Sequence, residues 1–142
     1  MKPMTWKYAE PLTDIAPIRK LESKINQSYP LDYVKCVLEN NAGYPSLHVF
    51  ETEKSSTRVF SDLLSVNESD IDNVYAPYET ISDRLGRKDI MPFAIDPFGN
   101  YICFDFSQSP PTVVFWHHET NELEPVSRTF SDLLNKLYED KD

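Results

Sequence analysis

Near the start of the chain, apolar residues recur every three or four positions, which is the spacing of one helical face. Between residues 15 and 25 they are Ile15, Ile18, Leu21 and Ile25. Asp14 precedes this run and is expected to cap a helix, and Pro17 is tolerated in its first turn. The pattern therefore predicts an amphipathic helix that packs its apolar face on a core.

A second helix is predicted over residues 31–40, because Leu31, Val34 and Leu38 lie on one stripe at helical spacing. Asp32 falls in its first turn, where a carboxylate interacts favourably with the helix dipole. We expect Leu31, Val34 and Leu38 to form its buried face.

After this helix, apolar and polar residues alternate, and this period of two residues indicates strands. Residues 46–51 and 57–60 are predicted to pair as a hairpin. Residues 90–119 are predicted to form three strands, joined by a tight turn at residues 96–100 and a proline-broken loop at residues 107–111. Within the middle strand, Ile102, Phe104 and Phe106 should face the core, whereas the face with Tyr101, Cys103 and Asp105 should stay partly available.

Two further segments complete the prediction. Residues 65–86 are interpreted as a short acidic helix plus a loop, because Pro77 limits any helix across them. Thr129 and Asp132 have the spacing of a capping box, with Asp in place of the usual Glu, and predict a terminal helix. Its buried stripe consists of Phe130, Leu133, Leu134 and Leu137.

The predicted elements follow the order of an α+β fold, with helices first, then several strands, then a closing helix. We therefore expect a mostly antiparallel sheet, with the N-terminal helices and the C-terminal helix packed on it. The length of 142 residues fits a single domain over residues 1–142, in which the first ten residues and the last few are expected to be loose.

The most specific pattern runs from Ile90 to Glu119 and reads IMPFAIDPFGNYICFDFSQSPPTVVFWHHE. A strand ending in Pro92-Phe93-Ala94 is followed by Asp96-Pro97-Phe98-Gly99-Asn100, an apolar strand ending in Asp105, and an apolar strand with Trp116 and a His-Glu step. This order resembles the SUKH superfamily of immunity proteins, in a SUKH-1-like form.

An upstream segment adds to the resemblance. Tyr29-Pro30-Leu31-Asp32-Tyr33 is similar to the step that leads into the second helix of SUKH proteins, and Asn40-Asn41-Ala42-Gly43 to the turn that ends it. Tyr29 replaces the usual apolar residue before Pro30, and Ala42 interrupts the usual Asn-Gly pair.

The resemblance implies an α+β domain and a bacterial immunity protein that works as an antitoxin. Such a protein binds the C-terminal domain of a cognate secreted toxin, often a nuclease, and blocks it inside the cell. Relatives of this domain in fungi are associated with cell-wall synthesis signalling, which leaves a non-catalytic regulatory scaffold as the alternative.

Net charge is concentrated in one part of the chain. Residues 59–83 carry six of the acids and no basic residue, which accounts for −6 of the total net charge of −9. Such a segment either keeps the protein soluble or binds a basic partner. Basic residues are too few and too scattered for a nucleic-acid surface, so direct binding of nucleic acid is not expected.

Other functional classes are also disfavoured. The chain has only three glycines, which excludes a glycine-rich phosphate loop and a Gly-x-Ser-x-Gly nucleophile elbow. No membrane segment and no signal-peptide core are found, so a cytoplasmic protein is expected. Cys36 and Cys103 fall in predicted buried elements, which favours reduced, structural cysteines over a disulfide.

Catalytic, metal and cofactor sites are not expected. His117 and Glu119 can point to one face of a strand, but His118 points to the other, and zinc needs three or four convergent ligands. Asp96 precedes Pro97 in a turn, where its side chain would accept from a backbone amide. A metal-dependent hydrolase using His117, Glu119 and Asp105 is the weakest alternative.

The side chains expected to contact a toxin are acids from the charged segment, acids near the ends of the strands, and aromatic anchors. They are Asp62, Glu68, Asp70, Asp72, Glu79, Asp83, Asp105, Glu119, Tyr75, Tyr78 and Trp116. Trp116 is also a natural core residue, because most aromatic side chains in strands are buried.

Overall fold

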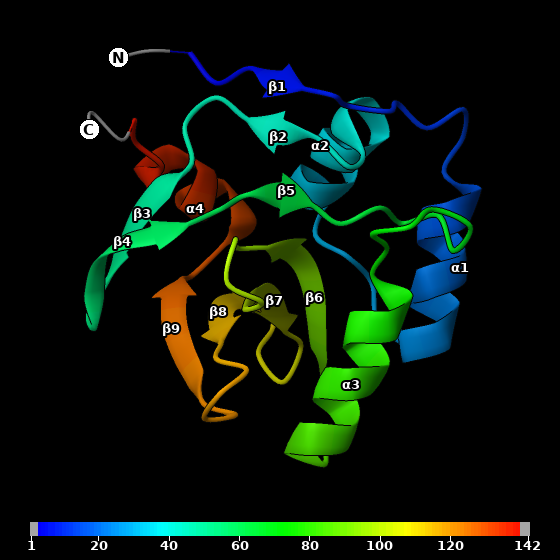
Figure 1. Ribbon diagram of the computed structural model, residues 1–142. Coiled ribbons are helices and arrows are strands. Elements are labelled where there is room, and N and C mark those ends of the chain that lie inside the picture. The colour runs from blue at the N-terminus through cyan, green and yellow to red at the C-terminus, as the bar shows by residue number, and fades with distance from the viewer. Residues whose placement is uncertain (1–2, 140–142) are drawn as a thin grey trace.

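The computed structural model describes residues 3–139, so the predicted loose ends lie partly outside the described residues. The described chain has an α+β fold, as expected, with helices packed around a mostly antiparallel sheet (Figure 1). Its elements, in chain order, are β1 (Trp6–Lys7), α1 (Ala16–Ile25), α2 (Leu31–Asn40), β2 (Tyr44–Pro45), β3 (Val49–Thr52), β4 (Ser55–Val59), β5 (Asp62–Leu63), α3 (Tyr75–Leu85), β6 (Ile90–Ile95), β7 (Tyr101–Asp105), β8 (Thr112–Trp116), β9 (Leu123–Ser127) and α4 (Phe130–Lys136).

The central sheet is antiparallel and has the order β5-β6-β7-β8-β9. Its three middle strands confirm the prediction for residues 90–119. The short strand β5 and the edge strand β9 were not predicted. β9 contains Glu124 and Pro125, which are depleted in strands, but an edge position tolerates a proline.

One face of the sheet packs on α2 and α4 through a cluster of aromatic rings. The Tyr33 ring of α2 lies 5.2 Å from that of Phe104 and 5.5 Å from that of Phe130, both edge to face. Phe93 and Phe104 lie 4.5 Å apart on neighbouring strands. Edge-to-face and offset contacts suit the ring quadrupoles and bury large apolar areas, so this cluster is the centre of the main core.

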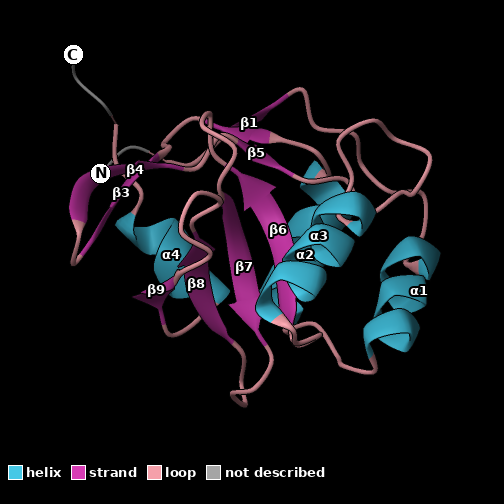
Figure 2. Ribbon diagram, turned by 60° about the horizontal axis from the view of Figure 1, so that its bottom comes forward, coloured by secondary structure: helices cyan, strands magenta, loops and turns pink. Residues whose placement is uncertain are grey.

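The opposite face is also covered. Ile81 of α3 packs with Ile90, Cys103 and Trp116 in a second, smaller core, and Figure 2 shows α3 lying along β6. This face was expected to stay partly available to solvent, and it does so only at the strand ends, where Tyr101 and Asp105 are partly exposed.

The first helix forms as predicted. The Ala16 amide donates a 2.7 Å hydrogen bond to Asp14 Oδ1, and Ile18 and Leu21 are buried. The second helix has the predicted bounds but a different buried face.

Leu31 is 72 % exposed, whereas Tyr33, Val34 and Val37 are buried. The prediction for Leu31 was therefore wrong. The aromatic cluster favours the face that carries the large Tyr33 ring, and Leu31, at the first position of α2, turns to solvent.

Residues 65–86 form a helix and a loop, as predicted, and α3 begins only two residues before Pro77. Pro77 is the third residue of α3, an 11-residue helix. The first amides of a helix have no intrahelical acceptor, so a proline at this position costs no hydrogen bond. The helix and the loop of the charged segment both exist, with the loop first, at residues 65–74.

The remaining local predictions are confirmed. β3 and β4 form the expected hairpin, with Phe50 paired to Arg58. Asp96 Oδ1 accepts 2.8 Å hydrogen bonds from the amides of Phe98 and Asn100, and Gly99 adopts a φ of +89° in this turn. Cys36 and Cys103 are both free thiols, and burial raises the pKa of Cys36 to about 11.

Candidate functional site

The acidic loop, residues 65–74, is closed by backbone hydrogen bonds between its two ends. The Ser65 amide donates to Asp72 O at 2.9 Å, and the Val74 amide donates to Ser65 O at 3.0 Å. Asn73 holds the loop from within, because its side-chain amide donates to Asp70 O and its Oδ1 accepts from the Tyr75 amide at the start of α3. The loop is therefore a compact, hydrogen-bonded unit.

A buried residue from α2's end anchors this loop. Asn41 is fully buried, donates to Ser65 Oγ at 3.0 Å and accepts from the Val66 amide at 3.0 Å. Ser65 Oγ in turn donates to Asp70 Oδ2 at 2.5 Å and accepts from the Asn67 amide. Buried polar groups that satisfy one another in this way favour one arrangement of the chain.

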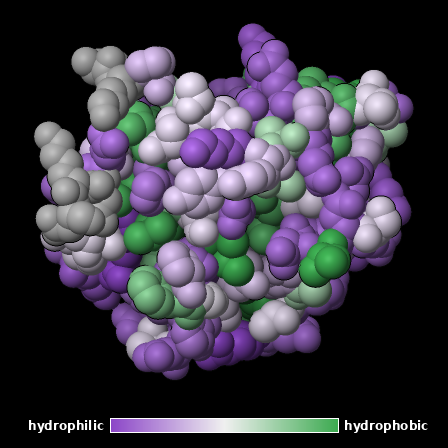
Figure 3. All heavy atoms as spheres, turned by 45° about the horizontal axis from the view of Figure 1, so that its top comes forward, coloured by the Kyte–Doolittle hydropathy of each residue, from purple (hydrophilic) through white to green (hydrophobic). Residues whose placement is uncertain are grey.

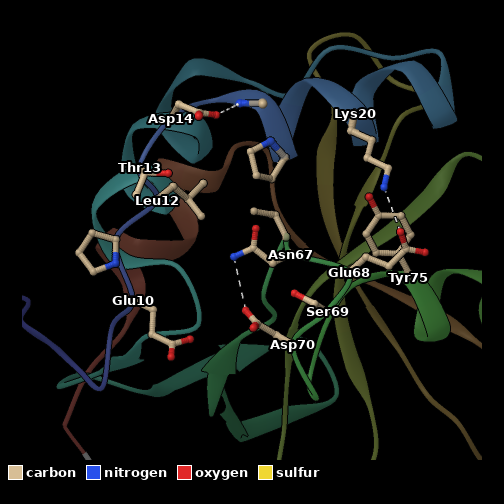
Figure 4. Close-up of a pocket in the computed structure, with 14 residues that line it drawn as sticks. Glu10, Leu12, Thr13, Asp14, Lys20, Asn67, Glu68, Ser69, Asp70 and Tyr75 are labelled. Carbon is tan, nitrogen blue, oxygen red and sulfur yellow. Dashed lines mark hydrogen bonds and ion pairs between the residues drawn. The ribbon is translucent and has the colours of Figure 1, made fainter.

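A groove of about 720 Å³ lies between this loop and the segment that leads into α1. Figure 4 shows Glu10, Leu12 and Asp14 on one wall and Asn67 and Asp70 on the other. Its carboxylates come from Glu10, Asp14, Glu68 and Asp70, and Lys20 is the one cation among the described residues that line it. The groove is thus predominantly acidic.

Two of these contributors were not predicted from the sequence. Glu10 was not singled out, and Asp14 was recognised only as a helix cap. Hydrogen bonds from the Glu10 amide to Asn41 O and from the Leu12 amide to Leu38 O bring this segment to α2. No local sequence signal marks that contact, because it joins residues about 30 positions apart.

Lysines of α1 neutralise part of the charge. Lys20 Nζ lies 3.0 Å from Glu68 Oε1, and Lys24 Nζ lies 3.2 Å from Glu79 Oε1. The hydrogen bond to Glu68 raises the pKa of Lys20 above its usual value. All four side chains are well exposed, so these pairs contribute little stability and can exchange for other partners.

Two further acids lie near one end of the sheet. Asp62 pairs with Ile95, which also pairs with Tyr101. Partial burial raises the pKa of Asp62, with a smaller contribution from the nearby Asp72 carboxylate. Burial also raises the pKa of Tyr101, again helped by Asp72. Asp62 and Asp72 therefore extend the acidic surface from the loop to this sheet end.

The two tyrosines of α3 are placed differently. Tyr75 is half-buried and lines the groove, with the Lys20 ammonium 5.9 Å from its ring centre. Tyr78 is only 5 % exposed, and its hydroxyl donates to Lys88 O at 2.7 Å. Tyr75 is thus a surface residue of the site, whereas Tyr78 belongs to the core. Farther along α3, Glu79 and Asp83 are exposed.

Asp105 lies at the other end of β7 from Tyr101, about 13 Å away for a five-residue strand. Its carboxylate accepts from Arg87 Nη2 at 3.2 Å and from Ser107 Oγ at 2.6 Å. Asp105 is therefore a paired carboxylate, and the strand separates it from Asp62 and Asp72.

Trp116 is 2 % exposed, so its side chain presents almost no surface to a partner. Its indole Nε1 donates to Asn121 Oδ1 at 2.9 Å, and the Arg84 guanidinium lies 4.9 Å from its ring centre. Glu119 is exposed, in the turn that follows β8.

The convergence of His117 and Glu119 suggested by strand periodicity is wrong, because β8 ends at Trp116 and Glu119 lies in a turn. His117 Nε2 faces Glu124 Oε1 at 3.8 Å instead. His117 and Asp105 lie at opposite ends of β8, since Asp105 pairs with Thr112. Within residues 3–139, no group of three His, Cys, Asp or Glu side chains is placed to hold a metal ion.

Comparison with known proteins places these features in a family. The model of the SMI1 / KNR4 family (SUKH-1) matches residues 13–136, which include α1 to α4 and the whole central sheet. No curated protein matches the chain. Among the described residues, the helices are too short or too polar to span a lipid bilayer.

Proposed function

The chain belongs to the SMI1 / KNR4 (SUKH-1) family, and from this premise we propose that it is an immunity protein that binds and neutralises a cognate toxin domain. The proposed contact surface is the acidic groove together with the adjoining sheet end. Its residues are Glu10, Asp14, Asp62, Glu68, Asp70, Asp72 and Tyr75. The proposed partner is a basic toxin domain, and specifically a nuclease. The groove would cover the cationic surface of its active site.

One observation carries the proposal. Four carboxylates from segments more than 50 residues apart line one groove, whereas a single lysine does so among residues 3–139. An arriving cationic surface can interact favourably with several of these carboxylates at once, because they face the same groove. A nuclease cleft provides such a surface, because it must attract phosphates.

The way the groove is built also suits binding. The Asn41 and Ser65 hydrogen bonds hold the acidic loop in one conformation, so little conformational entropy is lost when a partner docks. The concentrated charge is expected to steer a basic partner and to raise its association rate at low salt. Catalysis has no part in this proposal, since occlusion alone blocks a toxin.

The test begins with a tagged protein used as bait in its native host, with bound proteins eluted by a rising salt gradient and identified by mass spectrometry. We expect a basic C-terminal toxin domain that elutes as salt increases, because exposed charge pairs are screened. Recovery of regulatory enzymes without a toxin would instead favour the scaffold alternative.

Two double variants with the same net charge then test whether the groove is the toxin-binding surface. Glu10→Lys combined with Glu68→Lys reverses two groove acids, and Glu51→Lys combined with Glu53→Lys reverses two exposed acids on the β3–β4 hairpin. Both pairs change the net charge from −9 to −5. We expect the groove pair to lower the association rate and affinity for the toxin domain about 10-fold or more, and the hairpin pair to have a much smaller effect. Equal effects would show that net charge, and not the groove, drives binding.

A further inference from the structure

The acidic loop carries an apolar side chain at an unexpected place. Ile71 is 98 % exposed, more than any other large apolar residue in the described chain, and it lies between Asp70 and Asp72. On the face shown in Figure 3, strongly hydrophobic residues occur only as small separate spots on a mainly polar surface. A partner of this face meets mostly polar side chains and few apolar points.

The backbone on both sides of Ile71 is fixed. Asp70 O accepts from Asn73 Nδ2 at 2.8 Å, and the Asp70 amide donates to Asn67 O at 3.2 Å. On the other side, Asp72 O accepts from the Ser65 amide at 2.9 Å. The loop therefore presents the Ile71 side chain at a defined position, although that side chain has no role in packing the fold.

Building on the proposed function, we propose that Ile71 is the apolar anchor of the toxin interface. It enters an apolar pocket on the toxin domain that is rimmed by Arg or Lys side chains. The rim cations pair with Glu68 and Asp72, which flank the anchor in the loop. Stable interfaces commonly have this anatomy, in which a few desolvated anchors dominate affinity and a polar rim excludes water.

Other exposed apolar residues fit this role less well. Leu31 is 72 % exposed at the first position of α2, and Phe98 is 70 % exposed in the β6–β7 turn. Neither lies in the acidic loop. Leu31 therefore provides a matched control, with a similar apolar side chain on a different surface.

The anchor and the charges make separable contributions to binding. Burial of an isoleucine side chain depends weakly on salt, whereas exposed charge pairs weaken as salt is added. Removing the Ile71 side chain without changing charge should therefore lower affinity by the same factor at every salt concentration. Neutralising Asp72 should reduce the dependence of affinity on salt.

The experiment measures the dissociation constant of the complex with the toxin domain recovered by the wild-type bait, from 50 mM to 500 mM NaCl. The variants are Ile71→Ser, Ile71→Leu, Asp72→Asn and the control Leu31→Ser. We expect Ile71→Ser to weaken binding about 10- to 100-fold, as full burial of an isoleucine implies. Ile71→Leu should recover most of this loss, and Leu31→Ser should stay within twofold of the wild type.

The outcomes separate this inference from the proposed function. A wild-type protein that recovers no basic toxin domain overturns both. A wild-type complex in which Ile71→Ser binds within twofold overturns the anchor and leaves the proposed function intact. A loss in Ile71→Ser that vanishes at high salt also overturns it, because the contribution would then be electrostatic. Thermal unfolding of each variant verifies that the fold is unchanged.

Discussion

The side-chain amide of Asn41 donates a 3.0 Å hydrogen bond to the hydroxyl of Ser65, and both residues are buried. This contact joins the end of α2 to the beginning of the acidic loop. Asn41 also accepts from the Val66 amide, so one side chain holds the loop at two points. The shape of the proposed binding surface thus depends on a residue that no partner can touch.

Asn41→Ala is expected to lower the free energy of unfolding by about 2–4 kcal/mol, because it leaves the buried Val66 amide and part of the Ser65 hydrogen-bonding capacity unsatisfied. Urea denaturation measures the change, and hydrogen exchange at the Val66 amide reports the loosening of the loop. Asn135→Ala, at an exposed position of α4, serves as control and should change stability by less than about 0.5 kcal/mol. If Asn41→Ala also lowered the free energy of unfolding by less than about 0.5 kcal/mol, this hydrogen-bond network would not be what holds the loop.

A second long-range contact joins α2 to α4. Asp32 Oδ2 accepts from the Ser131 amide at 2.9 Å and from Ser131 Oγ at 2.8 Å, so a carboxylate of α2 satisfies the first turn of α4. Asp32→Ala is expected to cost about 1–2 kcal/mol of unfolding free energy, as loss of a helix cap does. Ser131→Ala should cost less, because the amide hydrogen bond remains. Similar losses in the two variants would contradict the capping role; guanidinium denaturation measures both.

His117 gives folding a dependence on pH. Burial lowers its pKa below the usual 6.5, and the neighbouring Arg58 lowers it further, together with Lys54; Glu124 and Glu122 oppose this. At pH values between the lowered pKa of His117 in the folded protein and about 6.5, its pKa in the unfolded chain, the unfolded chain binds more protons at this site. The free energy of unfolding therefore rises with pH in this window. We expect the unfolding free energy to decrease as pH falls from 7 through 6.5, and His117→Gln to reduce this slope.

The measurement is a series of urea denaturations at pH values between 5 and 7.5, at constant ionic strength. The wild type and His117→Gln are compared by slope and not by absolute stability, because the substitution also changes packing against Phe115. Parallel slopes in the two proteins would rule out His117 as the source of the dependence.

Much of the fold follows from local sequence patterns. The helix at residues 16–25, the bounds of α2, the three central strands, the Asp96 turn and the capped α4 were all predicted, because each depends on neighbours within about four residues. Leu31 was misread, since its apolar spacing alone did not include its position at the first residue of the helix. β9 was missed because its strand pairing with β8, and not its composition, makes it a strand.

The sequence by itself also determined that this chain is acidic, that its charge is concentrated in residues 59–83, and that it carries the pattern of its family. Only the tertiary structure decided which of these acids form a surface. It brought Glu10 and Asp14 to the acidic loop, paired Lys20 with Glu68, placed Asp105 at the far end of β7 and buried Trp116. The propensity to form a helix or a strand depends on adjacent residues. A groove depends instead on packing between segments far apart in the chain, and this packing becomes defined only when the core forms.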